Sequence, residues 1–145
     1  MTRLRATLTV AATALLATAA CEDPAPPWDS EVTAELEATS YVVGDTATVQ
    51  FVNASSEPRY FVPCWAAGRL ESGVWEFFQP GSSACSSVPG VEIAPGGTLA
   101  REFKIWLDDA GDRATGTFRY TFYIRAGPGY ESETEAVATE AFVVN

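Results

Sequence analysis

The sequence predicts an all-β domain in which two antiparallel sheets, with seven to eight strands in total, pack as a sandwich. Short runs that alternate apolar and polar residues recur from residue 31 to the C-terminus. Clusters of Gly, Pro, Asn, Asp and Ser separate these runs, and no convincing helical pattern interrupts them. The 145 residues suffice for one hydrophobic core, so we expect a single domain with short appendages.

The first two strands are expected at 32–38 and 46–53. In both, apolar residues alternate strictly with polar ones, which is typical of a strand with one buried face. A Gly44-Asp45 turn precedes the second strand, and a polar turn at 53–58 follows it. The side chains expected to face the core are Val32, Ala34, Leu36, Ala38, Ala47, Val49 and Phe51.

The next strand is expected at 59–66, with bulky residues on both of its faces. These residues are Tyr60, Val62 and Cys64 on one face, and Phe61 and Trp65 on the other. We therefore expect both faces to be covered. The residues Glu71-Ser72-Gly73 predict a hairpin tip between strands at 65–70 and 74–78, and 79–90 is a loop rich in Pro, Gly and Ser.

The last three strands are expected at 98–107, 117–125 and 135–144. The side chains expected inward are Leu99, Phe103, Ile105, Leu107, Phe118, Tyr120, Phe122 and Ile124, whereas Arg119, Tyr123 and Arg125 should point outward. Arg101 also falls on the inward side, so we expect it near the end of its strand.

The N-terminus is typical of an export signal. Arg3 and Arg5 precede an uncharged run at 7–20, which is shorter than the roughly 20 residues that span a bilayer. Small residues then lead into Cys21, which resembles the lipobox of bacterial lipoproteins, although Thr18 stands where most lipoboxes have Leu.

This resemblance implies that Cys21 is acylated and becomes the first residue of a protein anchored in the cell envelope, outside the cytoplasm. The domain organisation is then a signal peptide at 1–20, an acidic, Pro-rich tether at 21–30 and a β-sandwich at 31–145. The alternative is an ordinary secretory signal that is cut near Ala19 or Ala20 and releases a secreted or periplasmic protein.

The cysteine count agrees with acylation. An exported protein with three cysteines leaves one unpaired. If Cys21 is acylated, Cys64 and Cys85 remain as a disulfide pair, whose loop of about 20 residues stabilises the fold by roughly 3 kcal/mol. The alternative is two buried free thiols.

Composition restricts the chemistry. The chain has no histidine, which excludes catalytic triads that depend on it. The net charge of −10 becomes −12 without the signal, so we expect repulsion from nucleic acid and no nucleic-acid partner. Four strand glutamates, at positions where solvated residues alternate with apolar ones, do not predict a catalytic pair: Glu35, Glu37, Glu76 and Glu102. We expect no enzymatic activity and no cofactor.

Two short motifs are interpreted as turns. The acidic cluster of Asp108, Asp109 and Asp112 offers oxygen ligands for calcium, but it lacks the spacing of an EF-hand loop, so no metal site is predicted. Asn53 and Ser55 match a glycosylation acceptor, yet a turn at this place needs such residues anyway.

An aromatic platform for a protein or glycan partner is a further possibility. It would use Trp65, Trp75, Trp106 and Tyr123. Trp106 is the strongest candidate, because inward neighbours on both sides turn its indole outward. The alternative is that these rings cover a sheet face.

Several fragments resemble bacterial immunoglobulin-like domains. Tyr41 is followed by the Gly44-Asp45 turn, a strand and the Asn53-x-Ser motif, and the later fragments lie at 73–76, 93–98 and 116–120. The same order is similar to the bacterial intracellular proteinase inhibitor family. The resemblance covers 31–144 and implies an immunoglobulin-like sandwich, but each motif is a turn or core signal and implies little about function.

The resulting hypothesis is a non-catalytic binding or structural module of the envelope, which uses strand edges or loops for contact. Apart from its lipid anchor it would have a protein or glycan partner. The alternative is an envelope proteinase inhibitor acting through the loop 79–90, which a bond between Cys64 and Cys85 would hold in a fixed shape.

Overall fold

The structure, a computed structural model, describes residues 30–78, 88–105 and 115–145. Within these ranges the chain forms ten strands and no helix. The strands are β1 (Val32–Leu36), β2 (Ser40–Tyr41), β3 (Thr46–Asn53), β4 (Arg59–Glu71), β5 (Val74–Phe78), β6 (Val91–Ile93), β7 (Thr98–Lys104), β8 (Gly116–Arg125), β9 (Thr134–Ala138) and β10 (Phe142–Val144). In this part of the chain there is therefore no helix long and apolar enough to cross a membrane.

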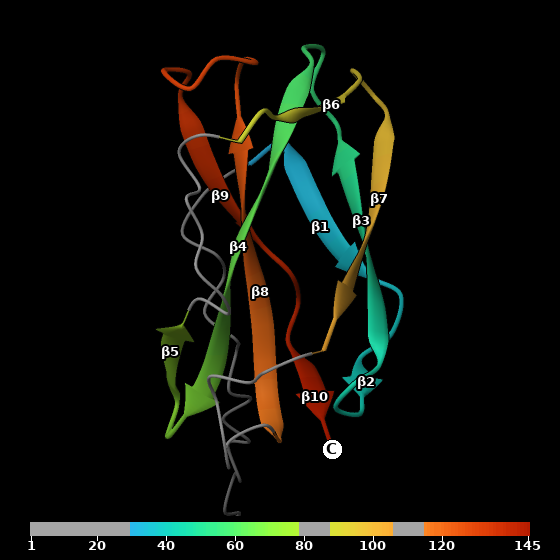
Figure 1. The fold of residues 1–145 in the computed structure, drawn as a ribbon, viewed down its shortest axis with the longest axis vertical. Helices are drawn as coiled ribbons and strands as arrows, with labels where there is room; N and C mark the ends of the chain where they lie inside the picture. The colour runs from blue at the N-terminus through green and yellow to red at the C-terminus, as the bar shows by residue number, and fades with distance from the viewer. Residues whose placement is uncertain (1–29, 79–87, 106–114) are drawn as a thin grey trace, which may run out of the picture.

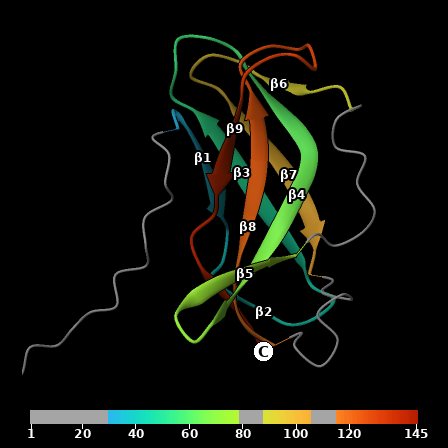
Figure 2. The same cartoon turned by 90° about the vertical axis from the view of Figure 1, so that its left-hand side faces the viewer.

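The predicted two-sheet sandwich is confirmed. One sheet has the order β1-β3-β7, and the other has the order β2-β10-β8-β4-β5, with β6 paired to β4 and β9 paired to β8. The two sheets form separate layers, with β4, β8 and β9 in front of β1, β3 and β7 in Figure 2 (Figures 1 and 2). The orders β1-β3-β7 and β10-β8-β4 correspond to A-B-E and G-F-C of an immunoglobulin sandwich. All strand pairs are antiparallel except β2 and β10, which run parallel.

The core lies between the sheets and is rich in aromatic rings. Phe51 of β3 stands 4.7 Å from Phe61 of β4 and 4.9 Å from Phe122 of β8, measured between ring centroids. The inward sets predicted for β3 and β8 are confirmed, because each of these side chains is fully buried: Ala47, Val49, Phe51, Phe118, Tyr120, Phe122 and Ile124.

Strand β1 is shorter than predicted. It ends at Leu36, and Ala38 is exposed rather than inward. The main chain turns away there because the amide of Ala38 donates a hydrogen bond to the Tyr41 hydroxyl, at 3.2 Å.

The strand boundaries of the larger sheet also differ from the prediction. The runs 59–66 and 65–70 form one continuous strand, β4, whose register with β8 shifts between Val62 and Trp65. The run 135–144 instead splits into β9 and β10. The amide of Thr139 donates to the Tyr120 carbonyl, whereas Phe142 pairs with Phe118, so one extra residue bulges out between the two strands.

Two local predictions about turns and edges have clear outcomes. The hairpin tip between β4 and β5 is confirmed, since Ser72 and Gly73 both have positive φ, at 51° and 83°. Arg101 lies in the middle of β7, opposite Val49, and not near the end of the strand. The position is tolerated because β7 is an edge strand, so the side chain remains partly exposed.

The Asn53 turn has the structural role that was predicted for it. The side chain is 0% exposed, and its amide nitrogen donates to the carbonyls of Glu57 at 2.8 Å and Ile93 at 3.1 Å. Ser55 donates its amide and its hydroxyl to the Asn53 carbonyl oxygen. These bonds tie the turn after β3 to the end of β6, and they leave no accessible amide for glycosylation.

Candidate functional site

The residues of the predicted aromatic platform do not lie together. Trp65 belongs to the core, where its ring centroid is 4.9 Å from that of Tyr120 and 5.9 Å from that of Phe103. Tyr123 is partly buried on the outer face of β8, between Val62 and Ala136. Trp106, the strongest candidate, lies outside the described residues.

Trp75 instead belongs to a cluster on the outer face of the larger sheet. Trp75 and Phe77 alternate along the edge strand β5, and their rings lie over Gly68 of β4. The guanidinium carbon of Arg119 on β8 is 4.3 Å from the Trp75 ring centroid and 5.3 Å from the Phe77 ring centroid. Leu70 pairs with Trp75 across the strands. We call Leu70, Trp75, Phe77 and Arg119 the aromatic patch.

The glycine at position 68 makes this arrangement possible. A Cβ atom there would stand 2.8 Å from the Cε1 atom of Phe77 and 3.3 Å from the Cε3 atom of Trp75, and the first distance is too short for any real contact. Without a side chain below them, the two rings rest directly on the sheet.

The patch is exposed and mixed in character. Phe77 has 53% of its surface exposed and Leu70 has 37%. The cationic guanidinium over the Trp75 ring is a cation–π contact, which orients both groups. The indole nitrogen of Trp75 is buried and has no hydrogen-bond partner among the residues that the structure describes. Exposed aromatic side chains beside an arginine are the composition found at the centres of protein interfaces.

Sequence reasoning missed Phe77 and Arg119 as members of this cluster. The alternation of 74–78 places Trp75 and Phe77 on one face, so their proximity could have been predicted from the sequence. The proximity of Arg119 could not, because it depends on the register that sets Gly68 opposite both Phe77 and Arg119, and this register comes from pairing between strands that are distant in the sequence.

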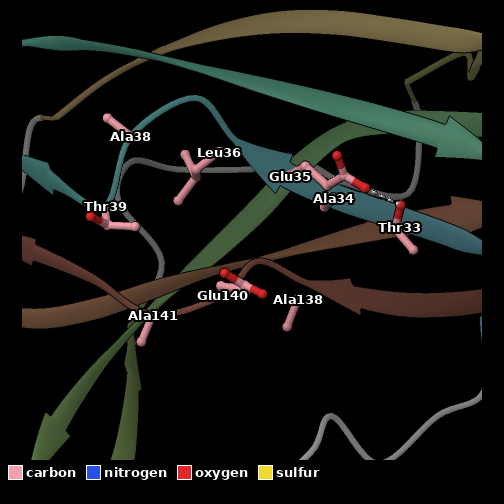
Figure 3. A pocket seen from close by; sticks show the side chains of 9 residues that line it. All are labelled: Thr33, Ala34, Glu35, Leu36, Ala38, Thr39, Ala138, Glu140 and Ala141. Carbon is pink, nitrogen blue, oxygen red and sulfur yellow. Dashed lines mark hydrogen bonds between the residues drawn. The ribbon is translucent and has the colours of Figure 1, made fainter.

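A second feature is a groove between the two sheets, which we call the edge groove. Its volume is about 430 Å³. Side chains of β1 and of the segment that follows it lie on one side, and those of the end of β9 and of the segment between β9 and β10 lie on the other (Figure 3). The lining residues are Thr33, Ala34, Glu35, Leu36, Ala38, Thr39, Ala138, Glu140 and Ala141. Sequence reasoning did not predict this groove.

The cysteines are only partly described. Cys64 is buried, with 1% of its surface exposed. Cys85, its expected partner, and Cys21, the expected lipidation site, both lie outside the described residues. The acidic cluster at 108–112 and most of the loop 79–90 also lie outside the described residues. The prediction of no calcium site at this cluster and the inhibitor alternative therefore remain predictions from the sequence.

Two tyrosines have perturbed acidity, and both belong to the core. Burial raises the pKa of the Tyr120 hydroxyl far above its ordinary value, and Tyr41 adds to the rise by charge repulsion. The pKa of Tyr41 is also raised, mainly by burial, while a hydrogen bond from the Ala38 amide opposes the rise. The described residues contain no group of three or more side chains placed to hold a metal ion.

No protein-family model matches the chain, and no curated protein matches its sequence. Similar solved structures include an alkylpurine DNA glycosylase AlkC of Pseudomonas fluorescens, with 13% identity over 81% of this chain and 31% of the other, at a TM-score of 0.42. The sporulation control protein Spo0M of Bacillus subtilis has 13% identity, with 79% and 49% coverage and a TM-score of 0.43. A PapD-like domain of human CEP192 has 14% identity, with 92% and 96% coverage and a TM-score of 0.31.

This chain thus spans less than half of the first two proteins, and all three TM-scores lie below 0.5. The likenesses assign no activity, substrate or partner. AlkC, one of these similar chains, is a DNA glycosylase. A sandwich fold does not by itself exclude catalysis, so the expectation that this chain has no enzymatic activity is withdrawn.

Proposed function

We propose that this protein is a binding module of the cell envelope, and that it contacts a protein partner through the aromatic patch. The observation that carries the proposal is the exposed Phe77 ring beside Trp75, with Arg119 stacked over both. An isolated exposed apolar residue needs no explanation, but a cluster of aromatic residues and arginine on one face of a sheet favours recognition.

A protein partner is favoured over a glycan by the same geometry. Sugar rings stack on the free face of an aromatic ring, whereas Arg119 already lies over the Trp75 ring at 4.3 Å. An exposed surface that combines Leu70, Phe77 and a guanidinium instead suits another protein surface, because apolar, aromatic and arginine side chains are enriched at protein interfaces.

The test compares two exposed apolar side chains in the full-length protein. Phe77→Ser should abolish co-purification of the partner from solubilised native envelope, because it removes the most exposed ring of the patch. Val43→Ser is the matched control, since Val43 is 51% exposed but lies in the turn between β2 and β3. Equal recovery of the partner with both variants would contradict the proposal.

The membrane attachment is a separate part of the proposal. The residues before Cys21 support acylation, and an acyl chain would hold the domain close to the bilayer through the tether 21–30. Replacing Cys21 with Ala should move the protein from the membrane fraction to the soluble fraction. A wild-type protein that is already soluble and has an unmodified N-terminus would exclude acylation of Cys21. The proposed role of the aromatic patch would not be affected by this result.

The disulfide follows from the same count of cysteines. If Cys21 is acylated, Cys64 and Cys85 remain as a pair, and a disulfide between them would tie the segment that carries Cys85 to β4. Reduction under denaturing conditions should increase the intact mass by two hydrogens without releasing a second chain. Two thiols that can be alkylated in the unreduced protein would exclude this pairing.

A further inference from the structure

The edge groove lies between two strands that each have one free edge. In the described part of the chain, β1 pairs only with β3 and β9 pairs only with β8. A free strand edge presents amide and carbonyl groups that pair readily with another strand.

The ladder bonds show which main-chain groups of β1 face the groove. The Glu31 carbonyl accepts from the Ala54 amide at 2.8 Å, and the Glu37 amide donates to the Thr48 carbonyl at 3.3 Å. The odd-numbered residues of β1 therefore bond to β3, and the amides and carbonyls of Ala34 and Leu36 point to the other side. Both residues line the groove.

The same reasoning applies across the groove. The Thr139 amide donates to the Tyr120 carbonyl and the Ala126 amide donates to the Glu133 carbonyl, each at 2.9 Å. The odd-numbered residues of β9 thus bond to β8, and the main chain of Ala138 points away from it. The groove therefore has main-chain donors and acceptors on both sides.

The side chains of the groove leave room and supply negative charge. Four of the lining residues are alanines, and the carboxylates of Glu35 and Glu140 are both exposed. No lysine or arginine is among the described residues that line it. Thr33 donates a hydrogen bond to Glu35 at 3.2 Å, as the dashed line in Figure 3 shows, and this bond partly orients that carboxylate.

We propose that the edge groove binds an extended, basic segment of a partner protein, which adds as a strand to β1 while its cationic side chains contact Glu35 and Glu140. Main-chain bonds to the end of β1 at Leu36, which is only partly buried, would supply affinity independent of sequence, and the two carboxylates would select for positive charge. A second copy of this chain is disfavoured as the occupant, because it carries a net charge of −10 and would bring a second acidic edge.

The experiment measures the affinity of the full-length protein for two fluorescent seven-residue peptides, one alternating Lys and Val and the other alternating Glu and Val. The wild type should bind the Lys peptide more tightly, and added salt should weaken this binding. The double variant Glu35→Lys, Glu140→Lys should lose about tenfold in affinity for the Lys peptide and should prefer the Glu peptide. Both side chains are exposed, so the variant should keep its fold.

Two further arms separate strand addition from simple charge attraction. A Lys peptide with N-methyl groups at alternate residues cannot pair along one edge, so it should bind at least about tenfold more weakly. Unchanged binding of this peptide, or equal peptide preference in the wild type and the double variant, would overturn the proposal. A dimer that the double variant abolishes would overturn it in favour of a second copy. Phe77→Ser should bind the Lys peptide like the wild type, so a failure of the aromatic patch leaves this proposal standing.

Discussion

The two faces of the larger sheet carry aromatic rings in different surroundings. On the inner face, Phe122 of β8 packs against Phe51 of the opposite sheet and is fully buried. On the outer face, Phe77 of β5 meets Arg119 and is 53% exposed. The residue type is the same, but Phe122 lies on a central strand that faces the second sheet, whereas Phe77 lies on the edge strand β5 and on the face turned away from that sheet. Alternation along a strand therefore decides which face a ring occupies, but the packing of the whole domain decides whether that ring stabilises the fold or remains available for contact.

Truncating one aromatic ring on each face should produce a large difference in the free energy of unfolding. Phe122→Ala should lower the free energy of unfolding by about 3 to 5 kcal/mol, because it leaves a cavity between the sheets. Phe77→Ala should change it by no more than about 0.5 kcal/mol, because its ring is half in solvent. Urea unfolding of both variants measures the difference. Similar losses would mean that the patch is part of the folding core.

A pH titration tests the buried inner face. In the unfolded chain a tyrosine hydroxyl ionises near pH 10, whereas in the folded protein burial keeps the Tyr120 hydroxyl protonated above this pH. The contribution of Tyr120 to the free energy of unfolding is therefore fully present below about pH 10 and is lost as the pH rises above it. The loss should approach about 1.4 kcal/mol per pH unit, and Tyr41 acts in the same direction.

Tyr120→Phe is the matched variant for this titration. It should flatten the loss between pH 10 and pH 11 without lowering stability at pH 7, because the hydroxyl has no hydrogen-bond partner in the described part of the chain. Urea midpoints at pH 8, 10 and 11 measure this. An equally steep loss in Tyr120→Phe would show that the hydroxyl is not the source.

The smallest effect on stability is expected for the floor of the aromatic patch. Gly68→Ala places a Cβ atom against Phe77, whose exposed ring can swing away, so the cost should stay below about 1 kcal/mol. The indole N–H signal of Trp75, one of four in the chain, should nevertheless shift in an NMR spectrum. An unchanged set of indole signals would mean that the rings do not rest on this glycine.

The inner face was readable from the sequence because it depends on local alternation. The inward residues of β3 and β8, the β4–β5 hairpin and the Asn53 turn all follow from short patterns. The edge groove could not be predicted from such short patterns, because the free edge of β9 depends on its pairing with β8. The bulge that separates β9 from β10 could not be predicted either, because no turn residue marks it and Thr139, Glu140 and Ala141 continue the strand pattern. The aromatic patch lies between these cases, because alternation aligns Trp75 with Phe77, but only register adds Arg119.

We propose that the aromatic patch is the surface that contacts a partner. A photo-reactive amino acid placed at position 77 of the full-length protein, and separately at position 43, measures this directly in intact envelope. Both positions are about half exposed, so chance encounters should label them equally. We predict one discrete cross-linked product from position 77 and none from position 43. No product from position 77, or the same products from both positions, would exclude the aromatic patch as this surface.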